Sequence, residues 1–276
     1  MSKLTWDAVG THLFETGVDQ GVLYLADSTG AYPEGVAWNG ITGVTQSPSG
    51  ADETKLWADN IKYVSLRAAE EFGGTIEAYT YPDEFAECDG SATVVAGLRA
   101  GQQPRKSFGL VYRTLIGNDV DLDSHGYMLH LVYGATCSPS QRSYATKNDS
   151  PEGVTFSWEF STNPVNFAGF KPTSYLEIDS TKFTTVAQKA LLAALETKLF
   201  GSDGTVSYTE FEGESFAEGT TYYERSGTSP NYVYTPTEDT SKQVGKTYYT
   251  KSTSGASDPY LPLPDEVAST LGYTAG

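Results

Sequence analysis

Two neighbouring segments between Ser107 and Gly134 alternate apolar and other residues, and a short acidic stretch separates them. In the first segment, one face of an extended strand would carry Phe108, Leu110, Tyr112, Thr114 and Ile116. In the second, one face would carry Tyr127, Leu129, Leu131 and Tyr133. Because side chains alternate between the two sides of a strand, the pattern predicts an antiparallel β-hairpin.

The reverse faces of these strands are not wholly polar. Val111 and Leu115 lie on that of the first strand, and Met128, His130 and Val132 on that of the second. A strand that is apolar on both sides is normally covered on both sides. We expect the domain's own core to cover one face and something else to cover the other.

Composition supports a mainly β fold. The chain of 276 residues contains 19 Tyr, 12 Phe, 28 Gly and 13 Pro, while only 19% of residues are charged. Aromatic residues favour strands, and Gly and Pro favour the turns between them. The length suits one large β domain with additions, or two modest domains.

The chain is strongly acidic, with 35 acidic and 18 basic residues and a formal charge of −17. Binding to nucleic-acid phosphates requires Lys and Arg, so this balance argues against a surface that grips DNA or RNA. The acidity suits a wall that repels nucleic acid, or it serves only solubility. No apolar run is long enough to span a membrane and no signal peptide is evident, so we expect synthesis in the cytoplasm and no membrane partner.

One amphipathic helix is predicted over residues 184–200. Its apolar face would carry Leu191, Leu192, Leu195 and Leu199, with Lys189 and Glu196 opposite. Thr184 or Thr185 can cap its start and Gly201 its end.

An internal repeat follows the helix. GTTYYERS at 219–226 and GKTYYTKS at 245–252 lie 26 residues apart, which predicts two copies of a small β unit. The Tyr pairs of these copies either form a core or stack on sugars. Leu261, Leu263 and Val267 would then return to the main core.

No arrangement of residues points to catalysis. The three histidines, His12, His125 and His130, lie in no nucleophile or metal-ligand motif, and His130 is expected to be a hydrogen-bonded structural residue. Asp119, Asp121 and Asp123 resemble the start of a calcium loop, but Ser124 and His130 replace its required Gly and Glu. Glu87 and Asp89 are expected to shape a turn, and Cys88 and Cys137 to be reduced thiols. We therefore predict a protein that is not an enzyme, with no catalytic, cofactor-binding or metal-binding residues.

An ordered series of segments resembles the major tail protein of long-tailed siphophages that infect Gram-positive bacteria. The series consists of WNGITGV (38–44), SPSGADETKLWADNIKY (47–63), TIEAYTYPDEFAECDGS (75–91), QQPRKSFGLVYRTLIGND (102–119) and HLVYGATCSPSQRSYATKNDS (130–150). The resemblance covers residues 9–204 and resumes at LPLPDEV (261–267), so residues 205–258 are an insertion.

The resemblance implies a tail-tube β-sandwich or barrel with one flanking helix, in three parts: a core at 1–204, the inserted repeat at 205–258 and a C-terminal segment at 259–276. It also implies stacked hexameric rings in a virion tail, which carry DNA through the lumen without specific binding. Besides other copies of the chain, the implied partners are tape-measure, tail-terminator and distal-tail proteins. The alternative is a carbohydrate-binding surface protein that uses the Tyr-rich repeats.

Residues 45–60 are predicted to form a polar hairpin arm that contacts the next ring. The residues expected to make this contact are Ser47, Pro48, Gly50, Asp52, Glu53, Lys55, Trp57 and Asp59. Trp57 is the expected anchor, because interfaces concentrate binding energy in such side chains. A free surface loop is the alternative.

Overall fold

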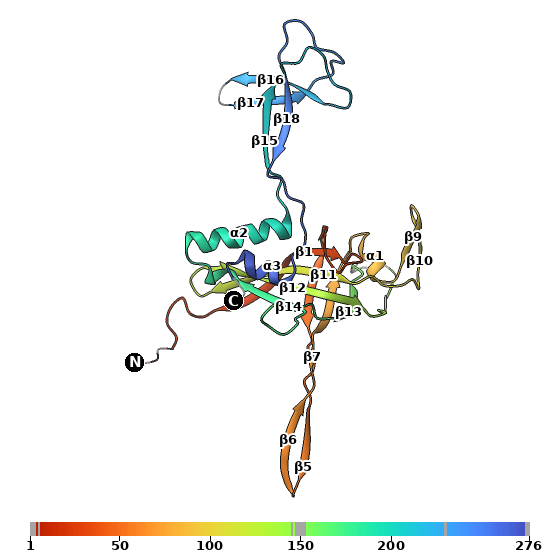
Figure 1. The fold of residues 1–276 in the computed structure, drawn as a ribbon, viewed down its shortest axis with the longest axis vertical. Coiled ribbons are helices and arrows are strands. Elements are labelled where there is room, and N and C mark those ends of the chain that lie inside the picture. Colours follow the sequence, from red (N-terminus) through yellow and green to blue (C-terminus); the bar gives the residue numbers. More distant parts are fainter. Residues whose placement is uncertain (1–3, 5, 145, 147–152, 229–230, 274–276) are drawn as a thin grey trace. The chain divides into compact units, whose positions relative to one another are not determined.

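The computed structural model describes residues 4, 6–144, 146, 153–228 and 231–273 (Figure 1). The chain divides into two compact units, one formed by residues 1–200 and 259–276 and the other by residues 201–258. The first unit thus ends at Phe200, a few residues before the predicted boundary at Gly204. The fold is mainly β, as the composition predicted.

The main sheet of the first unit is antiparallel and curls into a half-barrel. Its strands are β1 (Phe14–Leu25), β2 (Gly35–Trp38), β3 (Ile41–Gln46), β8 (Gly73–Ala78), β11 (Phe108–Asn118), β12 (Leu122–Cys137), β13 (Phe156–Thr162) and β14 (Tyr175–Asp179). The strand order is β2-β1-β11-β12-β13-β8-β3, and β14 also pairs with β12.

Strands β11 and β12 form the predicted central hairpin, and β12 changes neighbours along its length. Its segment Met128–Val132 pairs with β14, and its segment Ala135–Cys137 pairs with β13. Gly134 lies between them with a φ of 62°, a conformation that glycine adopts without strain. A Cβ atom there would lie 2.1 Å from the carbonyl oxygen of Asn163, so this crossing requires glycine.

Both faces of the central hairpin are covered, as predicted, and residues of the first unit itself cover each of them. On one side, Leu110 and Tyr112 join a core that contains Trp38, Phe85 and Trp158. On the other side, a second core takes in the following buried residues: Val111, Leu129 and Leu131 from the sheet, and Leu192, Leu195 and Leu199 from helix α2 (Val186–Phe200).

Helix α2 begins with a reciprocal cap. The Thr185 Oγ1 atom accepts a hydrogen bond from the Gln188 backbone N–H at 3.2 Å, and the Gln188 side-chain oxygen accepts one from the Thr185 N–H at 3.1 Å. Gly201 follows the helix with a φ of 75°. Two details of the predicted faces are wrong: Leu191 is exposed, and Glu196 faces the sheet, where it accepts a hydrogen bond from the Tyr127 hydroxyl.

Helix α2 is not the only helix in the described part of the chain. The short helices α1 (Phe85–Cys88) and α3 (Pro264–Thr270) and the 3₁₀ turn η1 (Ser180–Lys182) also form. The turn expected around Glu87 is therefore the helix α1, which buries Phe85 against Trp38 with ring centroids 4.4 Å apart. After residue 258, Leu261 and Val267 are buried in the second core, whereas Leu263 is exposed.

The second unit contains one antiparallel four-stranded sheet in the order β15-β18-β16-β17. Its strands are β15 (Thr205–Glu210), β16 (Tyr222–Thr228), β17 (Asn231–Pro236) and β18 (Tyr248–Ser254). The ends of the unit meet where Ser202 and Ser257 exchange backbone hydrogen bonds of 2.9 and 3.1 Å.

The predicted repeat is wider than its Tyr-containing segments. The offset of 26 residues relates β15 to β17 as well as β16 to β18. The first strand of each copy pairs with the second strand of the other copy, and β16 pairs with β18 across the centre at Tyr223 and Tyr249. The two copies therefore pack against each other around an approximate two-fold axis.

Candidate assembly surfaces

Residues 47–72, which we call the arm, form a narrow hairpin that leaves the main sheet between β3 and β8 (Figure 1). Its strands are β4 (Ser49–Gly50), β5 (Glu53–Ala58), β6 (Ile61–Arg67) and β7 (Glu70–Glu71). Asp59 and Asn60 connect β5 to β6 with φ angles of 49° and 62°. Two successive positive φ values define a type I′ turn, whose twist matches that of the flanking strands.

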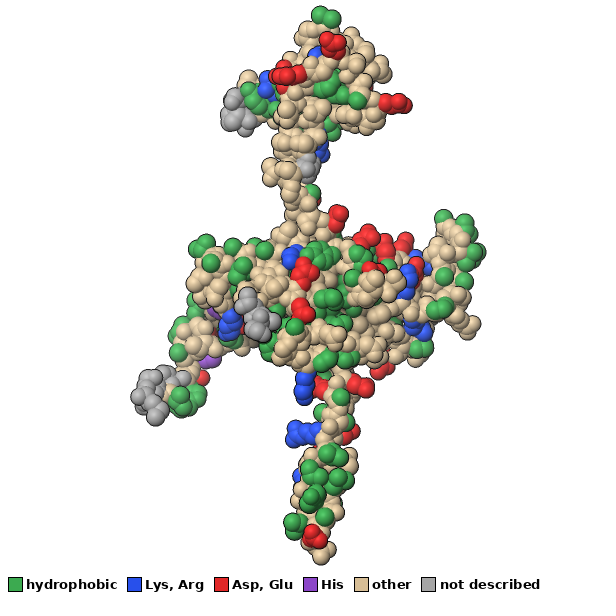
Figure 2. Space-filling view, in the orientation of Figure 1, with side chains coloured by type: hydrophobic (Ala, Val, Ile, Leu, Met, Phe, Trp, Pro, Cys, Tyr) green, Lys and Arg blue, Asp and Glu red, His purple; other side chains and the backbone are tan. Residues whose placement is uncertain are grey.

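Strands β5 and β6 pair with each other and with no other described strand, so the arm has no packed layer on either side. Cross-strand neighbours point to the same side of a hairpin. One side therefore carries the pairs Leu56 with Val64, Thr54 with Leu66 and Ala58 with Ile61. We call this side the apolar face of the arm, and Figure 2 shows hydrophobic side chains along the hairpin.

The opposite side of the arm is charged. Glu53 lies between two lysines there, with its carboxylate 2.6 Å from the Lys62 Nζ atom and 4.0 Å from that of Lys55. The hydrogen bond from Lys62 is the largest cause that lowers the pKa of Glu53. Trp57 is 67% exposed and pairs with Lys62, next to a β-bulge in which Tyr63 of β6 has no partner residue on β5.

The predicted contact residues occupy only the outgoing half of the arm. Ser47, Pro48, Gly50, Asp52, Glu53, Lys55, Trp57 and Asp59 lie along β4, β5 and the turn. The returning strand carries Ile61, Tyr63, Val64 and Leu66, all of them exposed. The arm is thus amphipathic rather than polar, and its apolar content comes largely from the returning strand, which lies beyond the predicted bounds of 45–60.

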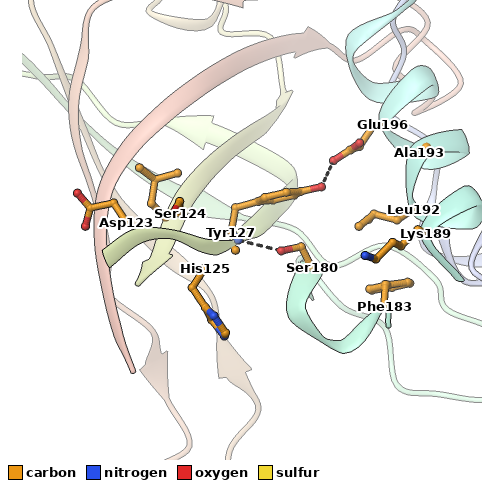
Figure 3. Close-up of a pocket in the computed structure, with 12 residues that line it drawn as sticks. Asp123, Ser124, His125, Tyr127, Ser180, Phe183, Lys189, Leu192, Ala193 and Glu196 are labelled. Atoms are coloured by element: carbon orange, nitrogen blue, oxygen red, sulfur yellow. Dashed lines mark hydrogen bonds between the residues drawn. The ribbon is translucent and has the colours of Figure 1, made fainter. Parts of the chain in front are cut away.

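A second surface feature lies between helix α2 and the start of β12. It is an open hollow of about 510 Å³ whose walls include Tyr127, Phe183, Leu192 and Lys189 (Figure 3). The backbone N–H of Tyr127 donates to the Ser180 hydroxyl at 2.8 Å, which fixes η1 beside the strand. Burial, followed by the hydrogen bond to Glu196, raises the pKa of Tyr127, so the phenol stays protonated.

His130 belongs to a hydrogen-bonded network inside the half-barrel. Its Nε2 atom lies 2.8 Å from the Thr114 hydroxyl, and its Nδ1 atom lies 2.5 Å from the Tyr175 hydroxyl. Gln46 of β3 donates to the hydroxyls of Tyr175 and Tyr112 at 2.5 and 2.8 Å. Burial lowers the pKa of His130, so a neutral, structural histidine links these strands.

The three aspartates of the DVDLD segment do not converge on one point. Asp119 accepts the Gly10 backbone N–H at 2.9 Å, and Asp121 lies 3.0 Å from the His125 Nδ1 atom. Asp123 instead lines the hollow beside α2. In the described part of the chain, no group of three His, Cys, Asp or Glu residues is arranged to hold a metal ion.

The two cysteines are free and buried in the first unit. Burial raises the pKa of the Cys88 thiol to about 12, and burial likewise raises the pKa of Cys137. Thiols with such raised pKa values are protonated at neutral pH and react slowly.

The Tyr pairs of the repeat are mostly core residues of the second unit. Tyr222, Tyr248 and Tyr249 are buried, and Tyr222 stacks on Phe216 with ring centroids 4.0 Å apart. The backbone N–H groups of Ala217 and Gln243 donate to the hydroxyls of Tyr222 and Tyr248 at equivalent positions of the two copies. These buried rings are therefore not available as stacking platforms for sugars.

Comparisons with known proteins give a structural likeness but no match of sequence. No family model and no curated protein sequence matches the chain. Among solved structures, a chain of the cryo-EM structure of the anti-feeding prophage baseplate is similar, with 10% sequence identity and a TM-score of 0.32. The likeness covers 63% of this chain and 97% of that chain. None of the described helices is both long enough and apolar enough to cross a membrane.

Proposed function

We propose that the chain is a structural subunit of a phage tail tube, which assembles as stacked hexameric rings and conducts DNA during delivery. The observation that carries the proposal is the arm, because it exposes Leu56, Ile61, Val64 and Leu66 on one face. Soluble monomers rarely expose contiguous apolar surface, and such surface marks an interaction site. The ordered sequence resemblance supports the same role.

The first unit suits this role because its own cores are complete. Both faces of the central hairpin are filled from within the chain, so the subunit can fold before it assembles. The arm is then the element that needs a partner, and a second copy in the next ring is the partner we propose for it. In this account the chain catalyses no reaction, and it resides in the virion tail together with the other tail proteins.

The acidity of the chain supports a role around DNA. Each subunit has a formal charge of −17, and the charges of all subunits in a ring add together. The low-dielectric protein wall focuses the resulting negative electric field into the channel. A negative lumen repels phosphates, so DNA would slide through it rather than adhere.

The test is to remove the arm without disturbing the sheet. Deleting 47–54 alone would remove β4, the partner of β7, and the residues that pair with Leu66 and Arg67 of β6, so it would expose more backbone. A cleaner variant replaces residues 49–71 with Asn-Gly, a pair that favours the two-residue hairpin turn. By negative-stain microscopy, wild-type protein should form rings or tubes and the variant should stay as folded subunits. Tubes from the armless variant, or strictly monomeric wild-type protein, would contradict the proposal.

A further inference from the structure

One face of the second unit's sheet carries five tyrosines and a stacked arginine. By strand alternation and register it contains Tyr208, Tyr223, Tyr232, Tyr234, Tyr249, Arg225 and Lys251. We call it the tyrosine face. The opposite face is occupied by Phe211 and Phe216 of the connecting segment, which pack on Tyr222.

The tyrosine face has a rigid centre that follows the two-fold symmetry of the repeat. Tyr208 and Tyr234 stack with centroids 3.9 Å apart and planes 1° apart. Each of them also meets a central tyrosine edge-on: Tyr208 lies 5.2 Å from Tyr223, and Tyr234 lies 5.1 Å from Tyr249. Rings held in this way give a surface whose shape changes little when a ligand arrives.

Arg225 breaks the two-fold symmetry of this face. Its guanidinium lies 4.4 Å from the Tyr232 ring centroid and 5.0 Å from that of Tyr249. At the equivalent positions of the other copy, Lys251 replaces Arg225 and Val206 replaces Tyr232. No cation–π contact of Lys251 occurs among the described residues, so the two-ring clamp exists once.

The clamped guanidinium has no anionic partner in the described part of the chain. No ion pair or side-chain hydrogen bond of Arg225 occurs there, although Glu210 lies on the same face and the chain has 35 acidic residues. Stacking leaves the edge of a guanidinium, with its N–H donors, free to bind a carboxylate or phosphate in a bidentate manner. Arg225 is therefore a preorganised donor for an anion from outside the chain.

The groups around Arg225 suit a sugar better than a bare ion. Tyr232 is 40% exposed, and the hydroxyls of Tyr208, Tyr223 and Tyr234 make no hydrogen bond with any described residue. Half-exposed aromatic rings with unpaired hydroxyls can stack on and hydrogen-bond to a polyhydroxylated ring. We propose that the tyrosine face binds an anionic polysaccharide, with Arg225 pairing with its acidic groups.

The experiment uses the full chain and four probes: polygalacturonate for carboxylates, dextran phosphate for phosphates, neutral dextran, and inorganic phosphate. Calorimetry should show saturable binding of at least one anionic polymer and much weaker binding of neutral dextran and of phosphate alone. Loss of a charge-assisted bidentate contact should make Arg225→Gln bind at least about tenfold more weakly. The control Lys242→Gln, beside Phe211 on the opposite face of the sheet, should change binding less than about twofold.

Arg225→Lys distinguishes the clamp from charge alone, because it keeps the charge but loses the planar fork, and it should bind nearly as weakly as Arg225→Gln. Tyrosine fluorescence and circular dichroism establish that each variant is folded. If Arg225→Gln does not fold, the binding of Arg225→Lys tests the proposal in its place. The proposal is overturned if no anionic polymer binds, if neutral dextran binds equally well, or if Arg225→Gln and Lys242→Gln weaken binding equally. Ring formation should be the same in all these variants as in the wild type. The outcome of the binding experiment is therefore independent of the outcome of the arm-deletion experiment.

Discussion

Replacing the apolar face of the arm with serines should stop assembly and leave the subunit folded. The variant Leu56→Ser/Ile61→Ser/Leu66→Ser changes three side chains that are 44%, 63% and 54% exposed in the free chain. Full burial of such a side chain is worth about 1.5–3 kcal/mol. Because roughly half of each is still exposed, docking would add about 1 kcal/mol per residue, or about 3 kcal/mol per arm.

A loss of about 3 kcal/mol weakens each contact by roughly a hundredfold. Since rings stack through several arms at once, the total loss should exceed that of one contact. Sedimentation velocity across a concentration series measures the shift from assembled to free subunits. Circular dichroism and thermal unfolding should show a stability close to that of the wild type, because the substitutions lie on the surface.

The control changes the other side of the same hairpin. Lys55→Ser/Lys62→Ser removes the lysines that flank Glu53 but leaves the apolar face intact. Exposed ion pairs contribute about 0–1 kcal/mol, so this variant should assemble almost normally. The reasoning is refuted if the triple serine variant assembles like the wild type, or if the lysine control fails as badly.

Three further predictions concern the folded subunit. Leu195→Ala, in the fully buried contact between α2 and the sheet, should cost about 2–5 kcal/mol in chemical denaturation, and a value below 1 kcal/mol would argue against that packing. Gly134→Ala should destabilise the protein far more than Gly97→Ala. Both glycines have a positive φ, but only at Gly134 would the added Cβ atom collide with a backbone oxygen. Equal melting temperatures of the two variants would contradict this. Hydrogen bonds from Tyr248 and then from Lys246 lower the pKa of Asp239. The ionised carboxylate therefore stabilises the folded second unit above the ordinary carboxyl pKa, and this stabilisation is lost as pH falls through the lowered pKa. Asp239→Asn should remove that acid transition from the tyrosine fluorescence of the second unit.

Much of the fold was predictable because its signals are local. The alternation from Phe108 to Tyr133 gives β11 and β12, and the leucine spacing with Thr185 and Gly201 gives α2. The course of β12 was not predictable, because its change of partner at Gly134 depends on strands far away in sequence. A strand pattern also looks the same whether its apolar side packs within the chain or against another molecule.

The candidate surfaces show this limit most clearly. Residues 61–67 alternate like a half-buried strand, yet they form the exposed half of the arm, and the Asp59–Asn60 turn was the available signal for a two-residue hairpin. The repeat was detected from its Tyr pairs, but its first strands, with Tyr208 and Tyr234 at the same offset, were missed. The clamp on Arg225 depends on the pairing of the two copies, which spacing alone does not fix.

The most direct test of the tail-tube account is a cryo-EM reconstruction of the particles that the purified wild-type chain forms. The account predicts stacked rings of six subunits, with density for residues 47–72 crossing from one ring to the next and the apolar face of the arm buried against the neighbour. Particles without six-fold rings, or rings in which the arm stays exposed to solvent, would contradict it.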